Sequence, residues 1–402
     1  MTTTTLPLRA EVDVASPRFG LPQLATLTAG AFAVGTSEFL MMGTLPDVAR
    51  GLGVSVSAAG QLIAAFALGI AIGGPLLAGA TARFDRRAVL AVAMLAFVLT
   101  NVAVAAVPDY RVALLMRFLG GALGGLFYGV AFATAARMAA PGKRAGAIAT
   151  VLTGVTLATV MGSPLGAWTG QAWGWRWPYA VIALGAVGVA VAAWRLLPSM
   201  AGDTGIDRGW RGARDGIGKM LSVFSNRPLA LAYLAIALVN TGWFTLYTYV
   251  APYWTIVGDV DTRWIPAALF AYGVLSAIGG AWGGALANRG ARRIMAAAII
   301  AQGVAFVLLL GSAGAPPAML AASMLWGLAA WVFVSAAQAR VVELAGDKAD
   351  VASSVAVSAF NVGNAAGAAV GGLAVGAVGL AHLPWVALAM LFLGLASAWR
   401  AR

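Results

Sequence analysis

Twelve long apolar stretches restrict the fold of this sequence more than any other feature. A helix needs about 20 mostly apolar residues to cross the hydrocarbon core of a membrane, whereas a strand of a membrane barrel needs only about 9–11. Only helices and closed barrels satisfy every backbone polar group in lipid, and these stretches are too long for barrel strands. We therefore predict an all-α integral membrane protein with twelve transmembrane helices, at 22–45, 56–80, 87–107, 111–136, 145–169, 178–197, 229–251, 264–286, 293–312, 316–338, 350–378 and 383–399.

The composition supports a lipid environment. Of the 402 residues, 61% are hydrophobic and 10% are charged, against about 25% charged in soluble proteins. The 51 glycines suit membrane helices, where small residues let backbones approach closely. Cysteine is absent, which excludes disulfides and thiolate metal sites. The single histidine, His382, falls in a predicted loop and is interpreted as a surface residue. We predict no metal and no cofactor.

The net charge of +12 raises the possibility of a nucleic-acid partner, but the positions of the charges argue against one. Basic residues concentrate in alternate loops, which marks the cytoplasmic side of a membrane protein. We therefore predict that both termini are cytoplasmic and that nucleic acid is not a partner. The predicted cytoplasmic loops carry three clusters outside the central segment, namely Arg83, Arg86 and Arg87, then Arg137, Lys143 and Arg144, then Arg289, Arg292 and Arg293.

Two segments of the chain are predicted to lie outside the spans. Residues 1–21 are polar and lack the apolar core of a signal peptide, so they are interpreted as a cytoplasmic tail. Residues 198–228 form a central cytoplasmic loop with an amphipathic stretch that includes Trp210 and Phe224. This stretch either lies on the anionic inner leaflet or is a solvated linker.

An internal repeat divides the chain into two halves. The segment A-T-A-R-F-D-R-R at 80–87 matches L-A-N-R-G-A-R-R at 286–293, so that three arginines align at an offset of 206 residues. Pro46 and Pro252 share this offset, and Gly162 and Gly367 lie 205 apart. We predict two homologous six-helix bundles, at 22–197 and 229–402. Such repeats suit alternating access to a site near the bilayer midplane.

Several motifs resemble the major facilitator superfamily, and within it the bacterial arabinose, purine-ribonucleoside and chloramphenicol exporters of the twelve-span drug:proton antiporter family. The resemblance covers nearly the whole chain from about residue 22. The matching motifs are Gly35-Thr36-Ser37-Glu38-Phe39 with Leu45-Pro46, Arg117 with Gly120-Gly121, Gly162-Ser163-Pro164-Leu165-Gly166, Gly174-Trp175-Arg176 and Asn361-Val362-Gly363-Asn364. The fifth-span motif around Pro164 implies antiport. The resemblance implies the major facilitator fold and transport of small molecules across a bacterial plasma membrane, and we expect a monomer.

The loop after the second span departs from the family pattern D-R-x-G-R-R. Ala82 stands in place of the acidic residue, and Asp85 stands in place of the glycine. Asp85 could substitute for the missing acid. The loop arginines are predicted both to set the topology and to gate, namely Arg83, Arg86, Arg87, Arg289, Arg292 and Arg293. Asp85 and Gly162 are predicted to take part in gating. Pro164 of the fifth span removes a helical hydrogen bond, so it is interpreted as a hinge, as a seal between the halves, or as passive packing.

Glu38 and Arg117 are the ionisable residues that fall clearly within predicted spans. A charge at the bilayer centre costs several kcal/mol and is usually functional. Loss of water favours the protonated form of a buried carboxyl, and a nearby arginine opposes this. We predict that these two residues couple protonation to conformation. The alternative is a structural pair that fastens the first and fourth spans.

Helical spacing predicts the substrate cavity. Asn240, Trp243 and Tyr247 share one face of the seventh span, and Ser358, Asn361 and Asn364 form a polar stripe in the eleventh. Tyr128 lies three turns beyond Arg117 on the same face, and Thr36 belongs to the first-span motif beside Glu38. Few polar groups in an apolar setting are typical of ligand sites. Polar stripes also fasten helices to one another, and aromatic residues also face lipid.

The predicted function is a proton-coupled exporter of small organic molecules such as drugs, sugars or nucleosides. One alternative is a symporter or facilitator for uptake, and another is a receptor or enzyme without net transport. Catalytic chemistry has little support. The run from Gly212 to Lys219 lacks the spacing of a phosphate-binding loop, and Met220 stands where that motif has Ser or Thr.

Overall fold

The computed structural model describes residues 20–140, 142–202, 218 and 222–401. The predicted N-terminal tail up to residue 19, the amphipathic stretch around Trp210 and the run from Gly212 to Lys219 lie largely outside the described residues. The described part of the chain contains twelve helical segments that are long and apolar enough to cross a membrane, as predicted. The described residues contain helices and no strands.

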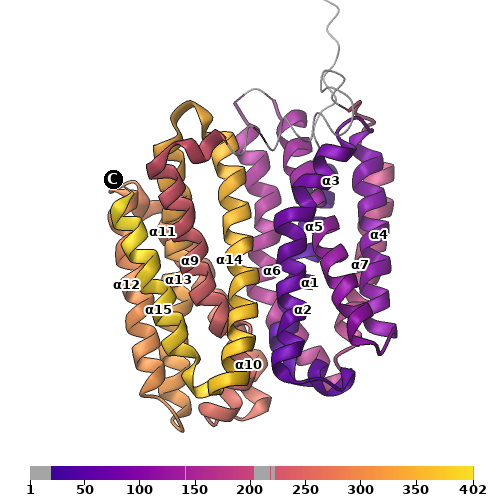
Figure 1. The fold of residues 1–402 in the computed structure, drawn as a ribbon. Coiled ribbons are helices and arrows are strands. Elements are labelled where there is room, and N and C mark those ends of the chain that lie inside the picture. The colour runs from indigo at the N-terminus through magenta and orange to yellow at the C-terminus, as the bar shows by residue number, and fades with distance from the viewer. Residues whose placement is uncertain (1–19, 141, 203–217, 219–221, 402) are drawn as a thin grey trace, which may run out of the picture.

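Six of these segments form the first bundle (Figure 1). Its second span is a helix interrupted by a π-helical segment, η1. In chain order the elements are α1 (Leu21–Leu52), α2 (Val56–Leu68), η1 (Gly69–Gly73), α3 (Gly74–Thr81), α4 (Arg86–Ala106), α5 (Tyr110–Met138), α6 (Arg144–Trp173) and α7 (Trp177–Leu196).

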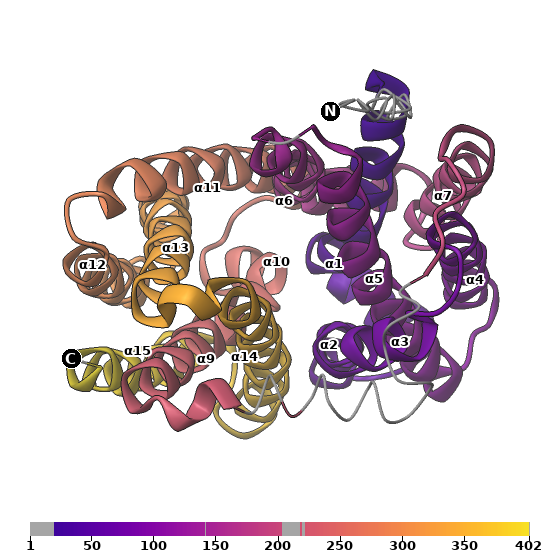
Figure 2. The same ribbon diagram turned by 90° about the horizontal axis from the view of Figure 1, so that it is seen from above.

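The other six segments form the second bundle, beside the first in both views (Figures 1 and 2). Its elements are η2 (Val223–Ser225), α9 (Arg227–Tyr247), α10 (Val250–Pro252), η3 (Tyr253–Val257), η4 (Thr262–Trp264), α11 (Ile265–Ala287), α12 (Ala291–Leu310), α13 (Pro316–Ala345), η5 (Gly346–Lys348), α14 (Ala349–Val378), η6 (Leu380–His382) and α15 (Leu383–Arg400).

The structure interrupts one predicted span near a proline residue and leaves two other spans with internal prolines continuous. The predicted span 229–251 ends as a regular helix at Tyr247, and the chain continues through α10 and the π-helical η3. Pro252 lies at this break, where the missing N–H removes a helical hydrogen bond. By contrast, α1 and α6 continue through Pro46 and Pro164 without a break.

Large apolar side chains cover the outside of the helices. Leu99, Leu184, Leu373 and Phe392 are each at least 70% exposed. In a water-soluble protein such a surface would be an association site. In a chain with twelve membrane-length helices, it is the surface that contacts lipid.

Glycines let the helices of the first bundle meet backbone to backbone. A Cβ atom added to Gly121 of α5 would lie 2.0 Å from the carbonyl oxygen of Phe66 in α2, and one added to Gly69 would lie 2.2 Å from the carbonyl oxygen of Phe118. Only glycine fits such a contact. The seam between α2, η1 and α5 therefore holds these elements together as one unit.

The two bundles touch closely at one face of the molecule and less closely at the other. We call the face where α3 is followed by α4, and α11 by α12, the basic face, because it carries the arginine clusters. Near the opposite face, Ser57 donates a hydrogen bond to the carbonyl of Gly372 at 2.6 Å. Gln171 donates to the carbonyl of Thr262 at 2.9 Å. The bundles are therefore closed at the face opposite the basic face.

Candidate functional site

Glu38 lies in the middle of α1, with 7% of its surface exposed. Its carboxyl group faces the side-chain amide of Asn364 in α14, across the boundary between the bundles. The Asn364 carbonyl in turn accepts a hydrogen bond from the Asn240 amide of α9 at 2.9 Å. We call this set the polar bridge: Glu38, Asn364 and Asn240. It places an acid of the first bundle beside two amides of the second.

Arg117 of α5 is buried beside α1 and α2, with 2% of its surface exposed. Its guanidinium donates to the backbone carbonyl of Ser37 at 2.8 Å and to that of Leu62 at 3.4 Å. It also lies 4.1 Å above the centre of the Phe66 ring. The ion pairs found among the described residues do not include one between Arg117 and Glu38. The two groups interact electrostatically at longer range.

Arg117 therefore has both a structural and an electrostatic role, and the sequence alone could not distinguish them. Its hydrogen bonds fasten α5 to the backbones of α1 and α2, which is the structural alternative. Its charge also acts on Glu38 through the dry interior, where electrostatic interactions are much stronger than in water. Ser37, the neighbour of Glu38, contacts Arg117 directly and donates to Asn101 of α4 at 2.9 Å.

An aromatic cluster adjoins the polar bridge in the second bundle. The rings of Tyr247 and Tyr272 stack with centroids 5.1 Å apart, and both contact Trp326 edge-on, at 6.0 and 5.2 Å. The Trp243 indole donates to the Tyr272 hydroxyl at 3.0 Å. From the first bundle, Phe39 approaches Tyr247 with centroids 6.5 Å apart. This aromatic cluster therefore begins one residue from Glu38.

Ser163 connects the fifth-span motif to this cluster. Its hydroxyl donates to the carbonyl of Phe39 at 2.9 Å and lies 3.3 Å from the Tyr247 hydroxyl. Its neighbour Gly162 packs on Thr36 and Phe39 within the first bundle. The motif thus contacts both α1 and the second bundle at the level of Glu38.

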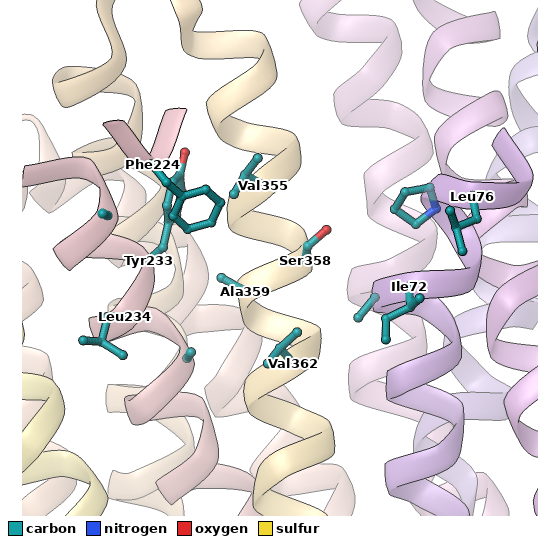
Figure 3. A pocket seen from close by; sticks show the side chains of 13 residues that line it. Ile72, Leu76, Phe224, Tyr233, Leu234, Val355, Ser358, Ala359 and Val362 are labelled. Atoms are coloured by element: carbon teal, nitrogen blue, oxygen red, sulfur yellow. The ribbon is translucent and has the colours of Figure 1, made fainter. Parts of the chain in front are cut away.

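A pocket of about 510 Å³ opens between the bundles on the side of the basic face. Figure 3 shows Ser358 on α14 pointing toward the segment with Ile72 and Leu76, while Val355 lies beside Phe224. Phe224 and Tyr233 close it on the side of α9. Ser358 supplies a hydroxyl in a lining that is otherwise largely apolar. Asn361 follows one turn along α14, and Asn364 follows one turn later, so the helix leads from the pocket to the polar bridge.

The remaining predicted cavity residues occupy varied positions. Asn361 donates to the carbonyl of Val357 in its own helix at 3.0 Å. The hydroxyl of Tyr128 donates to the carbonyl of Ala31 at 3.3 Å, and Tyr128 interacts electrostatically with Glu38. Thr36 differs from the prediction, because it lines a separate apolar pocket of about 310 Å³ between α1, α6 and α7. It faces away from Asn364 because it precedes Glu38 by two positions on the helix.

In the first half, Asp85 fixes the start of α4 within the loop that carries the arginines. Its carboxylate accepts hydrogen bonds from the Ser199 hydroxyl and from the Ala88 amide, which caps α4. Partial burial alone raises the pKa of Asp85, but the hydrogen bonds from Ser199 and from backbone amides together lower it below its usual value. Arg87 lies over the Trp194 ring at 4.6 Å. Asp85 is therefore a charged anchor for this loop.

Pro164 and Gly162 do not form the boundary between the bundles on their own. Pro164 is buried within an unbroken helix, and Gly162 faces α1. The boundary contact at this level is made by Ser163. The arginines of the second half, Arg289, Arg292 and Arg293, line a pocket at the basic face.

Sequence reasoning did not select Tyr272, Trp326 and Ser163. Tyr272 and Trp326 lie in spans that hold other aromatic residues, such as Phe270 and Trp331, and an aromatic residue in a span is equally compatible with lipid contact. Ser163 was inside a quoted motif, but only its glycine and proline neighbours were predicted to act. A clearer signal for Tyr272 and Trp326 would have been that they are aromatics flanked by Gly273 and Gly327, where close helix packing is expected.

Twelve spans in two bundles around a buried polar site are typical of secondary transporters. The family model of the Major Facilitator Superfamily matches residues 27–289. The inner membrane transport protein YdhP of Escherichia coli K12 is 35% identical over 90% of this chain and 91% of its own. The chain therefore belongs to the major facilitator superfamily, and it is a membrane transporter, not an enzyme.

Two further comparisons concern one relative in sequence and one solved structure. A chloramphenicol resistance protein of Streptomyces lividans is 32% identical over 86% of each chain. Among solved structures, a bacterial homologue of the human lysosomal transporter Spinster, in an inward-facing and unoccupied conformation, superposes with a TM-score of 0.78. It is 15% identical and covers 94% of this chain and 96% of its own, which shows the shared fold.

Proposed function

We propose that the protein exports small organic molecules from the bacterial cytoplasm in exchange for protons. Glu38 carries the proton in this scheme. The observation that carries the proposal is the position of Glu38, a buried carboxyl at the boundary of the bundles that faces Asn364. A proton on this group changes an interaction between the two moving parts, which is what coupling requires.

The physical basis of coupling is the change in hydrogen bonding at the polar bridge. An ionised carboxylate accepts a charge-assisted hydrogen bond from an amide, and such bonds are roughly twice as strong as neutral ones. Protonation of Glu38 weakens its link to Asn364 and removes a charge from the interior. In the proposed cycle, Glu38 takes up a proton from outside as substrate leaves, and it releases this proton inside before the next load.

Arg117 favours the release step. Its positive charge stabilises the ionised form of Glu38, while its own position is fixed by hydrogen bonds to Ser37 and Leu62. Arg117 is therefore proposed as the group that keeps the affinity of Glu38 for protons low enough for turnover.

The substrate is proposed to bind between the aromatic cluster and the polar bridge. Stacked rings of Tyr247 and Tyr272 suit flat, partly apolar molecules, and the amides of Asn240 and Asn364 supply hydrogen bonds. The side-chain oxygen of Asn240 is buried without a partner, which leaves an acceptor for a ligand. Relatives of the chain include a chloramphenicol resistance protein and a probable sugar efflux transporter, which fits a small substrate with both polar and apolar groups.

The proposed orientation places the basic face in the cytoplasm. Basic loops are retained on that side of the membrane. The arrangement closed at the opposite face would then be inward-facing, with the pocket around Ser358 as the part that opens toward the cytoplasm.

Proton movement in energised inside-out membrane vesicles tests this proposal. Chloramphenicol and arabinose serve as the two probes, added to vesicles whose lumen has been acidified. An antiporter releases protons from the lumen when its substrate is added. We expect release with the wild type and none with Glu38→Gln, which keeps the shape of the side chain but cannot ionise.

Asp109→Asn is the matched control. Asp109 is a loop carboxylate that caps α5 through the Val112 amide, and asparagine caps helices equally well. This variant should release protons as the wild type does. Equal substrate transport by wild type and Glu38→Gln without proton movement would contradict coupling and favour a facilitator. Proton movement in the same direction as the substrate would indicate a symporter.

A further inference from the structure

A second pocket, of about 450 Å³, lies at the basic face of the second bundle. It is formed where α12 begins and where α13 and α15 end. We call it the basic pocket. The charged and aromatic residues that line it are Arg289, Arg292, Arg293, Arg340, Glu343 and Trp399.

Among the described residues, the arginines of the basic pocket outnumber its acidic partners. Its carboxylate, Glu343, pairs with Arg340 at 3.2 Å. Arg340 also donates to the backbone carbonyl of Ala401 at 3.0 Å, and its Nε is buried without a partner. Among the described residues, no ion pair involves the other three arginines, Arg289, Arg292 and Arg293. Several guanidinium groups therefore converge on one cavity with a single carboxylate between them.

The internal repeat supplies a comparison within the same molecule. At the position of Asp85, which anchors the first-half loop, the second half has Ala291. Arg340 has no counterpart either, because the corresponding stretch of the first half is Ala133, Thr134 and Ala135. At the same offset Glu343 takes the place of Arg137, so the carboxylate of the second half stands beside Arg340 on α13 and not at the start of α12. The first half satisfies its loop with its own carboxylate, and the second half leaves that place open.

We propose that the basic pocket binds a phosphate group, either on the headgroup of an anionic phospholipid or on a free phosphate. Guanidinium groups match phosphate oxygens through paired hydrogen bonds. Basic pockets between membrane helices on the cytoplasmic side suit anionic headgroups. Trp399 is 56% exposed at the rim, where aromatic residues commonly sit at the membrane interface. The start of α12 adds backbone N–H groups, because Gly290 provides no side-chain cap.

A bound phosphate group would link α12, α13 and α15 through one ligand. This role is separate from proton coupling at Glu38 and from the direction of transport. Binding can therefore be measured on the purified full-length protein whether or not the proposed export function is correct.

Ligand binding to two charge-matched double variants tests the inference. Arg289→Gln with Arg293→Gln removes two exposed arginines of the basic pocket. Arg83→Gln with Arg87→Gln removes the aligned pair from the first half, so both proteins lose the same charge. The probes are phosphatidylglycerol, phosphatidylethanolamine with the same acyl chains, and inorganic phosphate. Retained lipid is counted by native mass spectrometry in detergent, and phosphate binding is followed by thermal unfolding.

We expect the wild type to retain phosphatidylglycerol in preference to phosphatidylethanolamine. The second-half double variant should bind it about tenfold or more weakly, because each basic residue near an anionic lipid contributes about 1 kcal/mol. The first-half double variant should change binding by less than about twofold. Arg292→Gln alone provides a second variant with a smaller expected loss.

The measurements with inorganic phosphate distinguish a site for a lipid headgroup from a site for free phosphate. Stabilisation of the wild type by inorganic phosphate, lost in the second-half variant, would identify a site for free phosphate. Retention of phosphatidylglycerol without any effect of phosphate would identify a lipid site. Equal weakening in both double variants would overturn the proposal. So would the absence of any preference for anionic phosphatidylglycerol over zwitterionic phosphatidylethanolamine, together with no effect of inorganic phosphate.

Discussion

Asn364 makes two contacts that no other residue of the site combines. Its side-chain oxygen accepts from Asn240 within the second bundle, and its amide faces Glu38 in the first. An amide can do both because it carries a donor and an acceptor on one rigid plane. The position of a single side chain therefore relates the state of the acid to the packing of α9 against α14.

Replacement of Asn364 tests this connection. Asn364→Ala removes the acceptor for Asn240 and the donor for Glu38 at once. Leaving buried polar groups without partners costs about 1–3 kcal/mol, so we expect a lower free energy of unfolding, measured by thermal or chemical denaturation in detergent. Proton release by substrate in inside-out vesicles should fall as well.

Asn361→Ala is the control for this substitution. It lies one turn away on the same helix, and its amide donates to the carbonyl of Val357 in that helix. Its loss should cost little stability, because the Val357 carbonyl lies in a regular helix. If both variants lowered the free energy of unfolding equally, the polar bridge would contribute no more to stability than a hydrogen bond within one helix.

Glu38 and Arg117 could be predicted from the sequence because an ionisable residue in a span is expensive and therefore conspicuous. Their separation could not be predicted, because it depends on how α1, α2 and α5 pack. The placement of Thr36 away from the boundary needed the rotation of α1 about its axis. A sequence motif shows which residues follow one another along the chain, but it does not show which helix each side chain faces.

At the scale of elements, apolar length predicted the twelve spans, because the thickness of the membrane sets a minimum length. The interruptions were harder to predict. Pro252 lies at a break after α9, whereas Pro46 and Pro164 lie in continuous helices. Proline removes one donor in every case, and the surrounding packing decides whether the helix continues. The π-helical η1 has no proline within its five residues, and the sequence pattern gave no sign of it.

The closed face depends on a glycine in α2. A Cβ atom added to Gly60 would lie 1.9 Å from the hydroxyl oxygen of Tyr249, which is itself fully buried. Gly60→Ala should therefore push the bundles apart at this face. We expect the distance between spin labels on α2 and α14 near this face to lengthen or broaden in the variant.

The absence of cysteine from the sequence makes this measurement direct, because introduced cysteines would carry the only labels. Gly129→Ala is a suitable control, because a Cβ atom there meets no heavy atom within 4 Å. Unchanged distances in Gly60→Ala would mean that Tyr249 moves aside without opening the face.

At the scale of the whole molecule, the orientation in the membrane follows from the distribution of charge. The basic face should lie in the cytoplasm. Single cysteines at Gly142, in the loop before α6, and at Pro108, in the loop before α5, can be labelled with an impermeant reagent in intact cells. We expect labelling at position 108 only, and labelling at both after the cells are opened.

The reverse pattern would place the basic face outside and would contradict the proposed direction of export. A cysteine at Thr262, beside the contact with Gln171, provides a second position on the outer face. It should label like position 108, although more slowly because of that contact.

The glycine seam in the first bundle has a mechanical consequence. Because α2, η1 and α5 meet backbone to backbone, the bundle resists bending and should turn as a stiff lever. Ser163 and Phe39 touch Tyr247 about midway along the helices, where such a lever would have its fulcrum. A ligand bound there, as proposed, would move little while the two ends of the bundle move far. A small change in ligand size near Tyr247 should then cause a larger change in the separation of the bundles at the two faces. How closely the bundles meet at a face would therefore depend on the size of the bound ligand.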